Sequence, residues 1–276
     1  MNVYSISLKG LRPQNEDNHE IILNMDEKDS NIKNINLFAV FDGHGGKQVS
    51  NYLKENLPKY FVDKRITYPI SKKYVMSVYD YIQKCLAKHA FSKNMGSTAL
   101  VVIHFKYNNE EYLNVINSGD SRCILCRDNF AMPLTKDHRP NMVEEYYRII
   151  ALGGEVKFDG MDWRIKDLSV SRAFGDIDAT PFLTHRPDLF RYKLDKTDKF
   201  IILSCDGLFE RLDNNTIVNF ILLNCYDSTL NNRINKHINI AKKLAEYAIK
   251  AGSGDNVSVI ICFFDHGILS YQSNNT

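Results

Sequence analysis

The sequence predicts an α+β fold in which antiparallel β-sheet is covered by helices. Short apolar, β-branched runs bounded by turn residues recur along the chain, and several are joined by short polar turns. Helical segments arrive in pairs, whereas a helix after every strand would indicate repeated parallel βαβ units. With 276 residues and 44% hydrophobic composition, the chain can bury one large core, so we expect a single domain over residues 1–276.

Eight segments have the apolar, β-branched composition and the turn-residue boundaries of strands. They are residues 2–8, 19–24, 35–41, 98–107, 111–117, 122–126, 199–205 and 257–264. Asn108 and Asn109 separate the fourth from the fifth, which is typical of an antiparallel hairpin. The polar segment Asn24–Asn36 predicts a surface loop.

Helical periodicity begins after Gly46 and returns in three later segments, where apolar residues recur on one face. These segments are residues 71–92, 213–224 and 232–250. Ser71 stands where a side-chain oxygen can cap a helix N-terminus. We interpret the apolar faces as core packing.

Composition and charge exclude several classes of function. The chain carries 35 Lys and Arg against 33 acidic residues without a run of like charge, so we expect neither a nucleic-acid nor a membrane partner. No stretch approaches the ~18 apolar residues of a membrane span, and the N-terminus lacks the pattern of a secretion signal. Six scattered cysteines then indicate reduced thiols. We expect a monomer in the cytoplasm, the nucleus or both. Cys123 and Cys126 lie in a predicted strand, and we expect their side chains to point to opposite faces of it.

Four aspartates stand at the ends of predicted strands. Asp42 and Asp206 each follow an apolar strand and precede glycine, Asp120 ends a third strand, and Asp255 precedes the last. A single aspartate of this kind is usually a turn residue. Four that converge would repel one another and lose hydration unless cations lay between them. Carboxylate ligands without a Cys or His cluster favour two Mg²⁺ or Mn²⁺ ions, which can generate a hydroxide nucleophile near neutral pH.

The N-terminal segment and the first glycine-rich loop add further candidates. Glu16 and Asp17 could serve as oxygen ligands or as partners of the ligands, and Arg12 offers a planar guanidinium suited to phosphate. His44 could protonate a leaving oxygen. Each alone would be read as a surface or loop residue, so these roles depend on the metal site. Because Gly43 lacks a Cβ, its backbone carbonyl can approach a metal ion closely.

Nine motifs, in order, resemble those of the protein phosphatase 2C family of metal-dependent serine/threonine phosphatases. They are LRPQNED, FAVFDGHGG, GSTAL, VINSGDSRCIL, PLTKDHRP, IIALGGEV, LSVSRAFGD, IILSCDG and GSGDNVSVII. The resemblance covers nearly the whole chain. It implies a four-layer αββα sandwich, two antiparallel β-sheets flanked by helix pairs, and phosphoproteins as substrates.

The resemblance also implies roles for individual residues. Arg12 would bind the substrate phosphate, a water bridging two Mn²⁺ or Mg²⁺ ions would attack phosphorus directly, and His44 would be the general acid. No covalent phosphoenzyme is expected. Asp42 would bridge both ions. The metal ligands implied are Glu16, Asp42, the Gly43 carbonyl, Asp206 and Asp255, with Asp120 joining Asp206 at a weaker third position.

The chain departs from the family pattern in the flap, residues 153–186, which shapes substrate choice in similar enzymes. Residues 161–172 lack the Asn-Gly turn common there, and the segment looks one residue shorter between Arg164 and Leu168. Substrate preference is therefore the inference that transfers least. Glu210 also replaces a common Asp, although no metal argument depends on it.

Two alternatives remain open from the sequence. Residues 176–180, DIDAT, match the D-x-D-x-T pattern of haloacid-dehalogenase phosphatases, although such a motif should follow an early parallel strand. The second alternative is a catalytically inactive relative that binds phosphoproteins as a scaffold. Such proteins usually lose a metal-binding Asp, whereas all are present here, and measured turnover separates the two.

Overall fold

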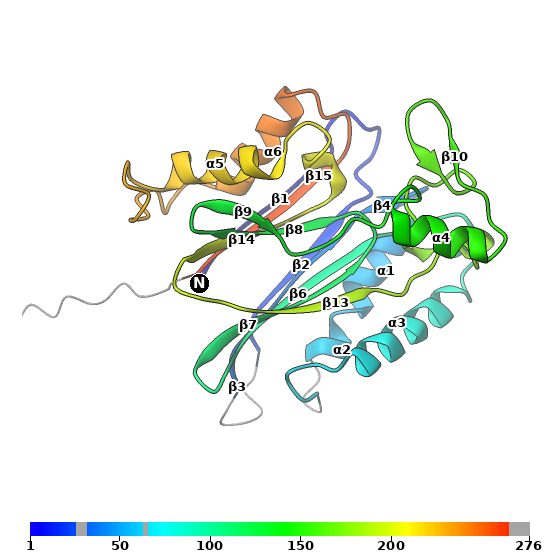
Figure 1. Ribbon diagram of the computed structural model, residues 1–276, viewed down its shortest axis with the longest axis horizontal. Helices are drawn as coiled ribbons and strands as arrows, with labels where there is room; N and C mark the ends of the chain where they lie inside the picture. The colour runs from blue at the N-terminus through cyan, green and yellow to red at the C-terminus, as the bar shows by residue number, and fades with distance from the viewer. Residues whose placement is uncertain (26–31, 63–65, 265–276) are drawn as a thin grey trace, which may run out of the picture.

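Two five-stranded antiparallel sheets form the centre of the molecule, as the computed structural model describes it for residues 1–25, 32–62 and 66–264 (Figure 1). The first sheet has the order β1-β15-β14-β8-β9. Its strands are β1 (Asn2–Leu8), β15 (Val257–Phe263), β14 (Asp198–Ser204), β8 (Arg122–Arg127) and β9 (Phe130–Pro133).

The second sheet has the order β13-β7-β6-β3-β2. Asn108 and Asn109, both with positive φ, turn the predicted hairpin between two of its strands. The strands are β13 (Asp188–Lys193), β7 (Glu110–Ser118), β6 (Ala99–Tyr107), β3 (Ile32–Phe41) and β2 (Asn18–Met25).

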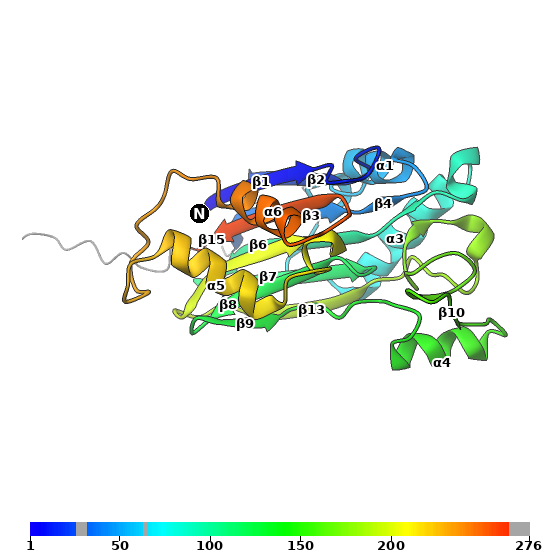
Figure 2. The same ribbon diagram turned by 90° about the horizontal axis from the view of Figure 1, so that it is seen from above.

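Helices cover the outer face of each sheet, which confirms the four-layer αββα arrangement (Figures 1 and 2). Three apolar cores follow from these layers: one under each helical layer and one between the sheets. Cys123 lies in the core between the sheets and Cys126 in the core under α5 and α6, so the prediction of opposite faces is confirmed. The helices are α1 (Gln48–Asn56), α2 (Lys59–Val62) and α3 (Lys72–Leu86) on the second sheet, and α5 (Asn214–Cys225) and α6 (Ile240–Lys250) on the first.

Side-chain caps fix where the helices begin. The Ser71 hydroxyl accepts a hydrogen bond from Tyr74 N, which confirms the predicted cap of α3. The Asn239 side chain caps α6, so the helix predicted over residues 232–250 is wrong for its first eight residues. Helix α3 likewise ends at Leu86, before the predicted end at residue 92.

Edge strands account for most of the other differences from the sequence predictions. Strands β9 and β13 were not predicted, because each is short, partly exposed and paired on one side only. Strand β3 begins at Ile32 and strand β2 ends at Met25, so the loop predicted over Asn24–Asn36 is wrong at both ends. Residues 26–31 of that predicted loop lie outside the described part of the chain. Within the described residues, no helix is long and apolar enough to cross a membrane.

The predicted flap lies beside α4 (Val143–Ala151) at one end of the sandwich (Figure 1). It contains a small hairpin of β10 (Lys157–Phe158) and β11 (Trp163–Arg164). Arg172, within the flap, donates to Glu145 of α4 (2.6 Å) and to Asp188 of β13 (3.1 Å), and Arg148 donates to the other Glu145 oxygen (2.8 Å). Burial opposes ionisation of Glu145, yet the hydrogen bonds from Arg172 and Arg148 lower its pKa to about 2. This ion-pair network, centred on a buried carboxylate, fastens the flap to the sandwich.

Candidate active site

A cavity of about 700 Å³ opens where strand ends of both sheets meet. Apart from Asp17, every residue that the sequence singled out for the site lines it. These residues are Arg12, Glu16, Asp42, Gly43, His44, Asp120, Asp206 and Asp255.

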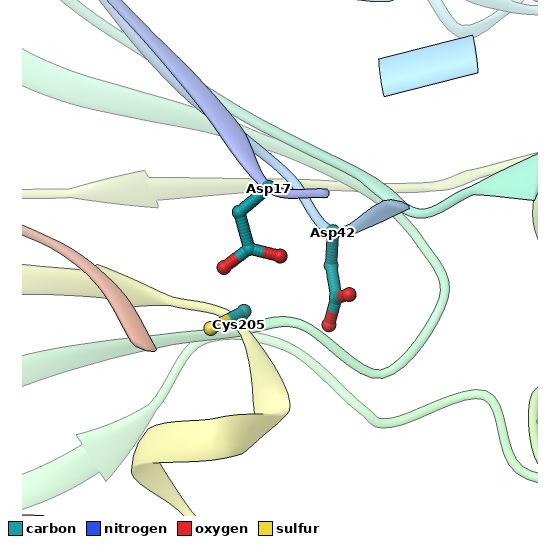
Figure 3. Close-up of side chains that lie close together, drawn as sticks. All are labelled: Asp17, Asp42 and Cys205. Atoms are coloured by element: carbon teal, nitrogen blue, oxygen red, sulfur yellow. The ribbon is translucent and has the colours of Figure 1, made fainter. Parts of the chain in front are cut away.

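Carboxylates from both sheets converge in this cavity. Asp42 follows β3 and Asp120 follows β7 of the second sheet, while Asp206 follows β14 of the first. One ligand atom from each of these three residues lies within 4.8 Å of the others. A second group, with the same spacing, joins Asp42 to Asp17 and the Cys205 thiol (Figure 3). Three of the four aspartates that were predicted to converge therefore do so, whereas Asp255 lines the cavity but belongs to neither group; Asp42 belongs to both.

Crowding and loss of water raise the pKa values of these acids. Burial, and then the charges of Asp17 and Asp206, raise the pKa of Asp42 well above its usual range. Burial raises the pKa of Asp17 to about 7. Burial and the charge of Asp255 raise the pKa of Asp206 to about 6. Such shifts mark groups whose ionised forms lack sufficient positive charge nearby.

Two arginines supply part of the missing charge. Arg12 donates to Asp255 Oδ2 at 2.8 Å, so these two predicted site residues contact each other. Arg139 places Nε 3.3 Å from Asp120 Oδ2 and Nη2 3.8 Å from Asp206 Oδ2. Arg139 belongs to the motif PLTKDHRP, but nothing in the sequence pattern assigned it a role in the site. Arg12 lines the cavity that the carboxylates share, whereas Arg139 lines a neighbouring pocket.

The donor set fits hard divalent cations. Asp17 accepts from Ser258 through Oδ2 (2.7 Å), whereas its buried Oδ1 has no hydrogen-bond partner. An unpaired buried carboxylate oxygen beside further carboxylates is an unfavourable arrangement that a cation relieves. Oxygen ligands predominate over the single thiol, as Mg²⁺ and Mn²⁺ prefer.

The two Asp-Gly pairs need glycine for close packing. A Cβ at Gly43 would stand 2.4 Å from the Glu16 carbonyl oxygen, and a Cβ at Gly207 would stand 2.1 Å from that of Asn256. Each glycine thus lets a neighbouring loop approach the aspartate before it. Glu210 holds the second loop, because its carboxylate accepts from Ser253 Oγ and Gly254 N at 3.1 and 3.0 Å.

His44 is held by a residue whose role the sequence analysis missed. His44 lies on the two-residue strand β4 (Gly43–His44), which pairs with β5 (Gly96–Ser97) and, through it, with β12 (Phe174–Gly175). This pairing brings Asp176, directly after β12, to 2.6 Å from His44 Nε2. A Cβ at Gly96 would stand 1.9 Å from the Asp176 carboxylate, so glycine makes room for the pair.

The same contact removes one alternative reading. The D-x-D-x-T match begins at Asp176, but it follows a short antiparallel strand, and its second aspartate, Asp178, is exposed outside the cavity. The residues therefore lack the parallel-strand context of an aspartyl nucleophile.

Without metal, we expect the free energy of unfolding to fall as pH rises from about 5 to 8. The unfolded chain releases these protons near pH 4, whereas folded Asp206 and Asp17 keep theirs up to about 6 and about 7. The native state then binds more protons than the unfolded state, so stability decreases with pH. Thermal melts in chelator at pH 5.5 and 8 measure this, and added Mn²⁺ or Mg²⁺ should raise Tm more at pH 8. A Tm that rises with pH in chelator would contradict the carboxylate cluster.

Known proteins are similar to this chain in sequence and in fold. A family model described as protein phosphatase 2C matches residues 1–257. Integrin-linked kinase-associated serine/threonine phosphatase 2C of Homo sapiens is 35% identical over 295 residues, covering 95% of this chain and 72% of that protein.

Two further relatives differ in how much of their length they share with this chain. PP2C-like domain-containing protein R307 of Acanthamoeba polyphaga mimivirus is 45% identical over 170 residues, covering 56% of this chain and 95% of that protein. Probable protein phosphatase 2C 52 of Oryza sativa subsp. japonica is 31% identical and covers 98% of this chain. The chain spans 52% of the length of this rice protein.

Solved structures share the fold. A C. elegans sex determining protein superposes with a TM-score of 0.82 at 25% identity, covering 95% of this chain and 64% of that one. A phosphatase from Toxoplasma gondii superposes with a TM-score of 0.77 at 22% identity, covering 96% of this chain and 94% of that one. The latter likeness shows the fold alone.

Proposed function

The chain belongs to the protein phosphatase 2C family of serine/threonine phosphatases, and on that basis we propose that it hydrolyses phosphoserine and phosphothreonine in proteins with Mn²⁺ or Mg²⁺ as cofactor. The observation that carries the proposal is the one cavity that carboxylates, Arg12 and His44 line together, with the His44 imidazole held by the buried Asp176. Few sites other than a metal centre would gather so many acids with raised pKa values.

The carboxylates of this cavity would hold the ions. We assign Asp42 to both ions, the Gly43 carbonyl and Glu16 to one of them, and Asp206 and Asp255 to the other. Asp120 would join Asp206 at a weaker third position. When bound, such ions supply a water that ionises near neutral pH and positive charge opposite the phosphoryl oxygens.

The chain's own side chains would orient the phosphate and move the proton. Arg12 is the exposed guanidinium at the cavity rim and would leave Asp255 to bind the phosphoryl oxygens. In the reaction, water adds to phosphorus as the bond to the seryl or threonyl oxygen breaks. His44 would donate a proton to that oxygen, and no phosphoenzyme forms. Asp176 would hold the imidazole through Nε2, leaving Nδ1 for the donated proton.

The test is phosphate release from a phosphothreonine peptide. We expect no turnover after chelation, and turnover that returns with millimolar Mn²⁺ or Mg²⁺, because the site residues by themselves supply no nucleophile. The same assay with an aryl phosphate measures the chemistry without peptide recognition. A folded, metal-loaded chain that hydrolyses neither substrate would contradict the proposal and favour a phosphoprotein-binding scaffold.

A further inference from the structure

The hairpin of the flap exposes large apolar side chains next to the active site. Phe158, Met161 and Trp163 are 54%, 84% and 42% exposed. Together with the outer face of α4, residues 142–163 hold more than half of the exposed large apolar side chains among the described residues. The hairpin and α4 lie at the same end of the sandwich, far from α5 and α6 (Figures 1 and 2). An apolar cluster of this kind, rimmed by charged residues, is typical of a binding surface.

The hairpin is built so that its two faces serve different cavities. Phe158 and Trp163 are paired across the two strands with ring centroids 5.5 Å apart, so both rings lie on one face. Arg164, the next residue, points to the other face and lines the active-site cavity. The Asp159 side chain closes the turn by accepting from Met161 N and Asp162 N, both at 2.8 Å. The turn between the two strands therefore holds the aromatic face in place.

A side pocket of about 260 Å³ lies against this aromatic face. Phe158, Met161 and Trp163 line it on one side. Asp162 and Ser169 line both this pocket and the active-site cavity, so the two hollows adjoin each other. The volume is below the ~300–1,000 Å³ typical of pockets for whole small molecules. It suits a single side chain.

Arg139 sets the distance between the side pocket and the reaction centre. Its guanidinium lines the side pocket and also lies 3.3 Å from Asp120 Oδ2 and 3.8 Å from Asp206 Oδ2. One guanidinium therefore separates the pocket from the carboxylates. An extended peptide advances ~3.3 Å per residue, so a residue within three positions of the phosphorylated one can reach across.

We propose that the side pocket is a subsite for one large apolar side chain of the phosphoprotein substrate, close in sequence to the phosphorylated residue. The inference rests on the proposed phosphatase function and adds a substrate preference to it. Two aromatic rings and a flexible methionine supply the apolar contact, and methionine adapts to side chains of different shape. The pocket lies in the segment where the chain departs from the family pattern, so we expect the preference to be particular to this chain.

Peptides that differ at one position test the subsite. The parent is a phosphothreonine peptide with Ser at three positions on each side, and Phe replaces each Ser in turn. We expect Phe at one or two of these positions to raise kcat/KM about tenfold, as the filling of an apolar subsite does. The effect is read as the ratio of kcat/KM for the Phe peptide to that for the parent. Because both values come from one enzyme preparation, partial misfolding does not alter the ratio.

Variants then locate the effect. In Trp163→Ser, and separately in Phe158→Ser, we expect the ratio to fall to about one. Leu223→Ser on α5, which removes an even more exposed apolar side chain (79%) outside both cavities, should keep the wild-type ratio. A wild-type enzyme that hydrolyses aryl phosphate but shows equal kcat/KM for all peptides would overturn the subsite and leave the phosphatase function standing. So would a preference that survives both substitutions, whereas a metal-loaded chain without any turnover would contradict the function and the subsite together.

Discussion

Asp206→Ala is expected to lower turnover at least about 10³-fold, because it removes a carboxylate that we assign to the metal site. The side chain is half-buried at the cavity wall and packs no apolar core, so the fold should persist. Loss of its charge also relieves repulsion with Asp255. We therefore expect the metal-free variant at pH 8 to melt above the metal-free wild type, although it has lost activity.

This pairing of lost activity with gained stability distinguishes a metal ligand from a structural acid. Phosphate release and chelator-treated thermal melts, on the same preparation, measure the two effects. The matched control is Glu246→Ala, which removes an exposed acid of α6 outside the cavity and should leave both near wild type. Activity retained in Asp206→Ala would refute the two-ion site.

His44→Gln should lower turnover by about 10²–10⁴ on a phosphothreonine peptide and much less on an aryl phosphate. A phenol ionises near pH 10, whereas an aliphatic alcohol needs a proton as it departs, so only the peptide depends on a donor. Asp176 contacts His44 Nε2 at 2.6 Å and orients the ring. Asp176→Asn should therefore shift the peptide-to-aryl ratio in the same direction, by a smaller factor. The measurement is kcat/KM for both substrates with saturating metal.

A second histidine–aspartate pair provides the control. His185 Nε2 lies 2.8 Å from Asp80 Oδ1, outside the active-site cavity. His185→Gln should leave the peptide-to-aryl ratio unchanged, because only the His44 pair faces the reaction centre. Equal losses on the two substrates in His44→Gln would argue against a general acid and leave His44 a structural part of β4.

Local chemistry explains what the sequence could predict. The apolar strands, the cap at Ser71 and the four strand-end aspartates are signals carried by neighbouring residues. Because strand ends of both sheets meet at one edge, Asp42, Asp120 and Asp206 converge as expected, and Asp255 lines the same cavity. The resemblance to a known family then implied roles that no spacing reveals, such as Asp42 as a ligand of both ions.

What the sequence did not predict depends on contacts between distant segments. Asp176 reaches His44 only because β12, β5 and β4 pair, and each of these strands has two residues. Arg139 meets Asp120 and Asp206 through the path of a loop, which no periodicity describes. The start of α6 was misplaced because apolar residues such as Ile234 continue the helical pattern before the Asn239 cap, although Ile234 is 58% exposed.

The Glu145 network has a consequence for how this enzyme can diversify. It ties Arg148 and Arg172 to the root of the flap and to β13, and none of its members is a carboxylate assigned to the metals. Residues 157–164 can therefore be exchanged while their anchorage and the ligand geometry stay fixed. Selection, or a loop graft between relatives, can then alter which phosphoproteins are recognised without first rebuilding catalysis.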